Sequence, residues 1–79
     1  MEDNQITIQY GLDSITKTFT PEQYGDSIGS ILTTRLLSAL NAPEGTAVLQ
    51  DGEYVDLNNS IEFYIGGTIT LEKQAATKN

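Results

Sequence analysis

Hydrophobic and polar residues alternate near the start of the chain. Between Gln5 and Tyr10, Ile and Tyr alternate with Gln and Thr, which is the period of a strand with one buried face. A second alternating run spans 15–20 and is rich in threonine, a β-branched residue that suits a pleated sheet. Because turn-forming residues occupy 11–14, the pattern predicts a β-hairpin over residues 5–20.

The next segment has a helical pattern, with apolar residues three or four positions apart as far as Leu40. It begins Thr-Pro-Glu-Gln at 20–23, which places a Thr cap, a Pro at the first helical position and a Gln three residues after the cap. Two glycines follow, and glycine destabilises a helix interior. We therefore expect this first turn to be separate from a main helix that is capped at Ser27 and ends at Leu40. Asn41 favours that end, since Asn tolerates the left-handed backbone conformation.

Strand patterns return in the second half of the chain. Apolar residues are adjacent rather than alternating in 46–50, as in a strand buried on both faces. Asp51-Gly52 is a strong signal for a tight hairpin turn. We expect, in order, a strand at 46–50, that turn, a short strand at 53–55, a polar loop at 56–60, an alternating strand with Ile61, Phe63 and Ile65, a break at Gly66-Gly67, and a last strand at 68–72.

A hairpin, one helix and then several strands predict an α+β fold, because a single amphipathic helix needs a sheet face to cover. We expect a mixed sheet of four to five strands covered by one helix. A right-handed crossover through the helix would place the third strand parallel to the first. The chain is interpreted as one domain, residues 1–79, with an ordered core of about 5–72 and a polar tail at 73–79 that has no hydrophobic anchor.

This order of elements resembles the β-grasp (ubiquitin-like) fold, and in particular its ThiS and MoaD branch. The similarity covers roughly residues 5–72 and rests on the helix start at 19–22, the Pro-containing exit at 42–44, the strand and Gly turn at 48–52, and the Gly turn and last strand at 65–71. The resemblance implies a sulfur carrier only where the chain ends in Gly-Gly, whose carboxylate is adenylated. This chain ends Ala-Ala-Thr-Lys-Asn, and Gly66-Gly67 precedes the last strand. Sulfur transfer and conjugation are therefore not expected, except for a degenerate relative.

The net charge of −7 reflects a shortage of basic residues. Eleven acidic residues among 79 are close to ordinary usage, whereas 4 basic residues are few. No Lys or Arg lies between Arg35 and Lys73. The second half should present a negative surface, which disfavours nucleic acids and anionic membranes and favours a protein partner with a basic surface. Simple solubility is the alternative explanation of the acidity.

The residue types present argue against catalysis. The chain has no Cys and no His, which excludes disulfides, thiolate zinc sites and imidazole acid/base chemistry. The oxygen ligands between Asp51 and Asn58 lack the spacing of an EF-hand loop, so no metal is expected, and no cofactor. Carboxylate catalysis needs a pocket that raises one pKa, which so small a domain can hardly supply. We expect no catalytic residues and no enzyme.

The N-terminal residues and the hydropathy of the chain bear on where in the cell the protein is located. The N-terminal residues carry acids where a signal peptide carries bases, and no apolar run is long enough to cross a bilayer. The expectation is a cytoplasmic protein that does not bind membranes. If a phage encodes it, the location would be the host cytoplasm or the virion.

Two tyrosines suggest a binding surface. If Ile61, Phe63 and Ile65 face the core, Tyr64 points outward, near Tyr54. Tyrosine is favoured at recognition surfaces. The candidate protein-binding patch consists of the tyrosines and the acids around them, Tyr54, Tyr64, Glu53, Asp56 and Glu62. Ordinary partial burial of both tyrosines is the alternative.

Four functions fit these observations. The first is a non-catalytic protein-protein interaction module that uses a β-grasp face or an exposed sheet edge, a mode that also suits homo-oligomers. Residues 71–78 resemble small bacteriophage proteins, which implies a structural or decoration subunit of a phage particle, or an acidic inhibitor of a host protein. The fourth is a degenerate sulfur-carrier relative.

Overall fold

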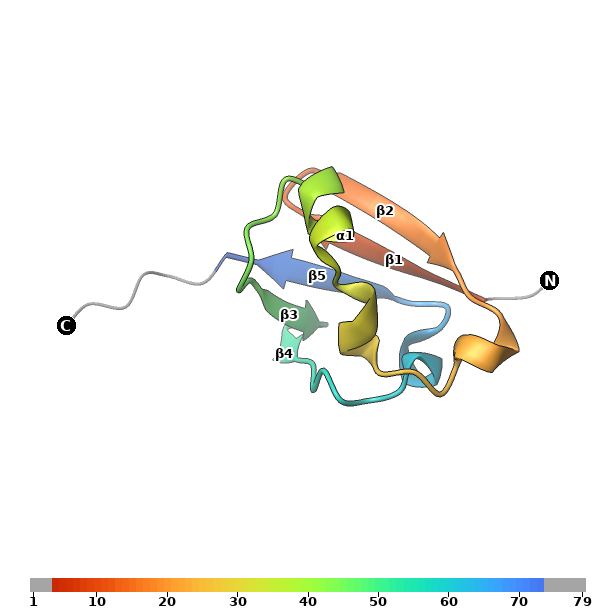
Figure 1. Cartoon of the computed structure of the whole chain (residues 1–79). Coiled ribbons are helices and arrows are strands. Elements are labelled where there is room, and N and C mark those ends of the chain that lie inside the picture. Colours follow the sequence, from red (N-terminus) through yellow and green to blue (C-terminus); the bar gives the residue numbers. More distant parts are fainter. Residues whose placement is uncertain (1–3, 74–79) are drawn as a thin grey trace.

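A mixed five-stranded sheet with few helical turns on one face forms the framework of the protein in the computed structural model, which describes residues 4–73 (Figure 1). The sheet order is β2-β1-β5-β3-β4. The strands are β1 (Gln5–Tyr10), β2 (Asp13–Thr18), β3 (Ala47–Gln50), β4 (Glu53–Tyr54) and β5 (Thr68–Glu72). The helical segments are the α-helix α1 (Thr34–Ala39) and the 3₁₀-helices η1 (Pro21–Gln23), η2 (Ile28–Ile31) and η3 (Ile61–Tyr64). The predicted polar tail beyond Lys73 lies outside the described residues.

The predicted first hairpin forms, with a turn two residues shorter than expected and with β2 at Asp13–Thr18. β1 and β2 pair antiparallel in one unbroken register that ends at Tyr10 opposite Asp13. Only two residues connect them, and the first, Gly11, has a positive φ of 62°. A glycine there allows a tight turn whose twist matches that of the strands. The hairpin therefore contains no bulge, and side chains keep strict alternation along both strands.

The prediction that the third strand runs parallel to the first is wrong. The parallel neighbour of β1 is β5, and β3 pairs antiparallel with β5. Burial explains this order: Ile69 and Leu71 of β5 are fully buried, as a central position requires, whereas the last residues of β3 are only half-buried. The mixed five-stranded sheet itself agrees with the expected α+β class.

The predicted continuous helix from Ser27 to Leu40 is also wrong, because it divides into η2 and α1. The Ser30 hydroxyl donates a 2.7 Å hydrogen bond to the Ser27 carbonyl, and such bonds compete with regular helix formation. β-branched residues and a glycine weaken this segment further. α1 then starts at Thr33, whose hydroxyl accepts a 3.2 Å hydrogen bond from the N–H of Leu36.

The end of α1 follows the prediction. Asn41 has a positive φ of 59°. Its N–H donates to the Ser38 carbonyl at 3.0 Å, and the N–H of Ala42 donates to the Leu37 carbonyl at 2.8 Å. These two bonds are the reciprocal pair of a Schellman motif. The chain therefore leaves the helix sharply and returns toward β3.

The predicted strand formed by Ile61, Phe63 and Ile65 is a 3₁₀-helix instead. In η3, Ile61 and Tyr64 are both buried, while Phe63 is 72% exposed. A 3₁₀-helix has three residues per turn, so side chains three positions apart lie on the same side. The inward-facing pair is therefore spaced by three, not by two.

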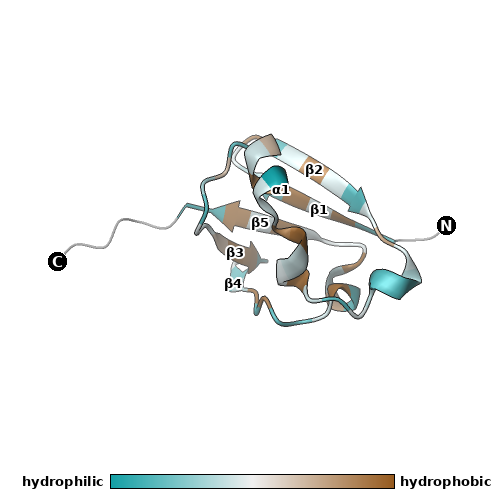
Figure 2. Ribbon diagram, viewed as in Figure 1, coloured by the Kyte–Doolittle hydropathy of each residue, from teal (hydrophilic) through white to brown (hydrophobic). Residues whose placement is uncertain are grey.

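The core lies between one face of the sheet and the helical segments. Hydrophobic colour follows β1, β5, β3 and α1, whereas β2 and η1 are mostly pale or hydrophilic (Figure 2). Ile6, Ile8, Ile28, Ile61 and Ile69 are almost completely buried. Within residues 4–73 no helix is long and apolar enough to cross a membrane.

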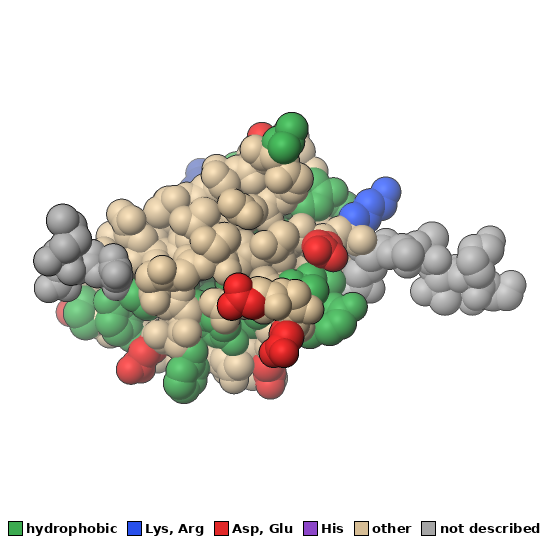
Figure 3. Space-filling model, turned by 180° about the vertical axis from the view of Figure 1, so that it is seen from behind, with side chains coloured by type: hydrophobic (Ala, Val, Ile, Leu, Met, Phe, Trp, Pro, Cys, Tyr) green, Lys and Arg blue, Asp and Glu red, His purple; other side chains and the backbone are tan. Residues whose placement is uncertain are grey.

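The other face of the sheet is uncovered by any described helix or strand. Seen from that side, the molecule is mostly uncharged polar, and acidic and hydrophobic side chains gather toward the border formed by β3, β4 and the loop that follows (Figure 3). The register puts Thr7, Thr16 and Thr68 on this face, because their neighbours in sequence Ile6, Ile8 and Ile69 point into the core. This uncovered face is where a partner has access to the sheet.

Candidate protein-binding surface

A row of side chains crosses the uncovered face from β4 to β1. Tyr54 lies opposite Leu49, Leu49 opposite Thr70, and Thr70 beside Gln9. Directly opposite residues in a sheet point to the same side, and their Cβ atoms lie about 4.5–5.5 Å apart. The row therefore starts with an aromatic and an aliphatic side chain and continues with polar ones.

Tyr54 is the most prominent member of this row, with 80% of its surface exposed. Its position depends on the Asp51-Gly52 turn, where both residues have positive φ angles, 54° and 84°. This is the two-residue hairpin turn that the sequence predicts, since Asp and Gly tolerate that conformation. The short turn fixes Tyr54 opposite the half-buried Leu49 on the neighbouring strand.

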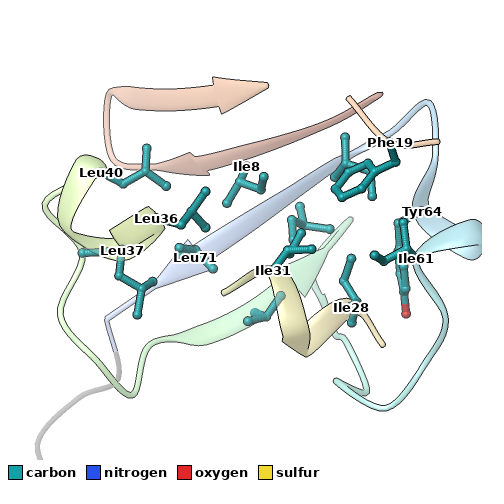
Figure 4. Packing of buried hydrophobic residues seen from close by; sticks show 14 residues of the cluster. Ile8, Phe19, Ile28, Ile31, Leu36, Leu37, Leu40, Ile61, Tyr64 and Leu71 are labelled. Atoms are coloured by element: carbon teal, nitrogen blue, oxygen red, sulfur yellow. The ribbon is translucent and has the colours of Figure 1, made fainter. Parts of the chain in front are cut away.

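Tyr64 is not part of a surface patch, which corrects the prediction that it points outward. It is only 7% exposed, and its ring lies in the core beside Ile61 and below Phe19 (Figure 4). Its hydroxyl accepts a 2.9 Å hydrogen bond from the side-chain amide of Asn59. The prediction fails because η3 turns inward the residue that a strand would have turned outward. Tyr64 is thus a structural residue.

The three predicted acids are all exposed, but they do not form one cluster. Glu53 precedes Tyr54 and lies opposite Gln50. Asp56 begins the next loop, where its carboxylate accepts a 2.9 Å hydrogen bond from the N–H of Asn58. Glu62 lies on η3, beside Tyr24, and Figure 1 shows η3 and β4 at opposite ends of the connecting loop. Glu53 is next to Tyr54 in sequence, but neighbouring residues of a strand point to opposite faces, so its side chain lies on the core side of the sheet.

Sequence reasoning missed three residues that lie on the surface near the predicted patch, Leu49, Phe63 and Glu72. Leu49 and Glu72 lie on the uncovered face near Tyr54, because they lie opposite Tyr54 and Ala47 in the sheet register. Phe63 is exposed at the far end of the loop, next to Glu62. The three-residue spacing of Ile61 and Tyr64 is the sequence signal that favours an exposed Phe63, but it competes with the two-residue spacing of Ile61, Phe63 and Ile65.

The loop between the two ends is firmly attached to η2. The N–H of Ile28 donates to the Asn59 carbonyl at 2.7 Å, and the N–H of Gly29 donates to the Leu57 carbonyl at 3.0 Å. A Cβ on Gly29 would lie 3.1 Å from both the Cβ and the carbonyl oxygen of Leu57. Glycine at position 29 therefore favours this close approach, because a side chain there would require Leu57 to shift by a few tenths of an ångström.

The described residues offer little for metal or substrate binding. In residues 4–73 no three Asp or Glu side chains come together as metal ligands, and no pocket opens in the surface of that part of the chain. No protein-family model matches the chain, and no curated protein is similar enough in sequence to be a relative. The surface chemistry therefore has to carry the functional argument.

Proposed function

We propose that this chain is a non-catalytic β-grasp module that binds a protein with a basic surface through the Tyr54 strip, which comprises Leu49, Tyr54, Thr70 and Glu72. The observation that carries the proposal is the 80% exposure of Tyr54 beside a half-buried leucine on an uncovered sheet face. Tyrosine offers a large, rigid contact area with a polar tip, the combination enriched in protein interfaces.

The electrostatics of the strip favour a cationic partner. Glu72 is exposed on the strip, and the sequence has no Lys or Arg from residue 36 to residue 72. Charges at the border of an interface mainly accelerate association, and added salt screens them. Binding through this strip should therefore combine a salt-insensitive contribution from the aromatic ring with a salt-sensitive one from the carboxylate.

The β-grasp assignment is supported by the sheet order β2-β1-β5-β3-β4, with parallel β1 and β5 at its centre and the helical crossover on one face. Gly66-Gly67 has a structural part in this arrangement. The N–H of Gly66 donates to the Gln5 carbonyl at 2.8 Å, and the Gly67 carbonyl accepts from the N–H of Thr7 at 3.1 Å. These bonds favour a binding module over a sulfur carrier that uses this Gly-Gly pair.

The test compares two exposed aromatic residues. The immobilised full chain is used to capture proteins from a lysate of its native host, in parallel with Tyr54→Ala and with Phe63→Ala as the matched control. We expect a basic protein that is recovered with the unchanged chain and with Phe63→Ala, but reduced about tenfold or more with Tyr54→Ala, as for an interface hot spot. Equal recovery by all three forms would overturn the proposal.

The contribution of the Glu72 carboxylate to binding is tested by the same capture experiment. Glu72→Gln should lower recovery of that partner and weaken its salt dependence, whereas Glu62→Gln on η3 should do neither. Both variants remove one charge from an exposed side chain, so an equal effect would mean that net charge matters and that the strip does not.

A further inference from the structure

β2 is an edge strand with a free outer side. It is the first strand in the order of the sheet, and every residue in it except Ile15 is exposed. Figure 1 shows it along the upper border of the sheet, and β1 is the only described strand that pairs with it. The opposite edge, β4, has only two residues. If the sheet is extended by another strand, β2 is the edge long enough to accept it.

The hairpin geometry determines which backbone groups of β2 are free. A two-residue turn makes Tyr10 and Asp13 a hydrogen-bonded pair, and hydrogen bonding then alternates along the ladder. The 2.8 Å bond from the N–H of Phe19 to the Asn4 carbonyl follows the same alternation, because residue 19 is also odd-numbered. Residues 13, 15 and 17 therefore bond to β1, while Ser14, Thr16 and Thr18 direct their N–H and C=O groups to the free side.

The side chains of this edge are complementary to a second copy of themselves. Asp13, Ile15 and Lys17 share the core side of the sheet, with Ile15 in the middle. Two such strands, antiparallel about a two-fold axis at Ile15, would place each Asp13 opposite the other copy's Lys17 and the two Ile15 side chains opposite each other. The same arrangement sets Ser14 opposite Thr16, both of which have free backbone groups.

We propose that β2 pairs with β2 of a second copy in this register, which makes one continuous sheet across a symmetric dimer. The contact is isologous, so it closes at two copies and leaves no free long edge. Both helical layers lie on the same side of the extended sheet, and the half-buried Ile15 gains cover from its counterpart. This inference does not rest on the proposed function, because the Tyr54 strip lies at the other end of the sheet.

The charges on β2 select this register against its alternatives. Sliding one strand by two residues places Ile15 opposite Asp13 or opposite Lys17. Sliding it by four places two Asp13 or two Lys17 against each other. In a parallel pairing through the same edge, the core side of one copy lies next to the uncovered side of the other, so neither the opposite charges nor the two Ile15 side chains meet. Inward-pointing charges on edge strands prevent unspecific pairing in natural sheets, and here they leave one favourable pairing.

The charge pairs provide the first test, by sedimentation of the full chain over a range of concentrations. The unchanged chain should show a monomer-dimer equilibrium. Asp13→Lys or Lys17→Glu alone places like charges opposite each other twice, which should raise the dissociation constant about tenfold or more. The double variant Asp13→Lys with Lys17→Glu restores opposite charges and should restore the dimer. A monomer at every concentration, or a double variant no better than the single ones, would overturn the proposal.

The backbone provides the second test. The N–H of Thr16 is not used by β1, and edge strands tolerate Pro where the N–H faces outward. Thr16→Pro should abolish the dimer while circular dichroism shows the fold retained, and Thr16→Val, which keeps the N–H, should still dimerise. Should Thr16→Pro fail to fold, amide hydrogen exchange of the unchanged chain decides the question. Slower exchange of Ser14 and Thr16 at high concentration is expected, and exchange independent of concentration would contradict the pairing.

Discussion

Asn59 holds Tyr64 in the core through a 2.9 Å hydrogen bond from its side-chain amide to the tyrosine hydroxyl. The carbonyl of the same residue accepts a 2.7 Å bond from the N–H of Ile28. Asn59 therefore connects η2 to η3, two helical segments that are far apart in the sequence. This connection lets a tyrosine be buried with its polar tip satisfied.

The two tyrosines should respond differently to loss of the hydroxyl. Tyr64→Phe removes the bond to Asn59 and should lower the free energy of unfolding by about 1 kcal/mol. Tyr54→Phe removes an exposed hydroxyl and should change it by less than about 0.5 kcal/mol. Urea denaturation followed by circular dichroism measures both. If the effects were equal, Tyr64 would not be buried as described.

The sequence was sufficient for elements defined by local chemistry. Alternation predicts β1, β2 and β5, and the preference of Asp51-Gly52 for positive φ predicts the second hairpin turn. Asn41 predicts the end of α1 for the same reason. In each case the residue type itself restricts the backbone, so few other conformations compete.

Elements that depend on distant contacts were mispredicted. Ile61, Phe63 and Ile65 satisfy a period of two, while Ile61 and Tyr64 satisfy a period of three, and the sequence alone does not choose between them. The choice is made by loop 56–60, through Asn59, and by the 3.2 Å bond from the N–H of Glu62 to the Tyr24 carbonyl. The same error misplaced Tyr64 and Phe63, so Tyr64 does not lie beside Tyr54 on the surface.

The close approach of η2 and the loop predicts that replacing Gly29 and Gly25 by alanine has opposite effects on stability. Gly29→Ala brings a Cβ to 3.1 Å from the backbone and side chain of Leu57, which should cost about 1–3 kcal/mol of stability. Gly25 has open space around its Cβ position and no positive φ. Gly25→Ala should be neutral or stabilise by up to about 1 kcal/mol, since alanine restricts the unfolded chain.

Thermal unfolding of these two variants is a direct comparison, because each adds a single methyl group to the same segment. A midpoint lowered for Gly29→Ala and unchanged or raised for Gly25→Ala is the expected result. Equal midpoints would mean that the loop can move away from η2 at little cost.

The division of the predicted helix can be tested at its two caps. The Thr33 hydroxyl accepts a 3.2 Å hydrogen bond from the N–H of Leu36, whereas the side chain of Ser27, at the start of η2, makes no capping bond. Thr33→Ala should therefore cost about 1 kcal/mol, and Thr33→Ser should retain most of the stability. Ser27→Ala should change stability by less than about 0.5 kcal/mol. If urea denaturation showed the larger loss for Ser27→Ala, the helix would begin at Ser27, and the Ile28–Ile31 segment would belong to it.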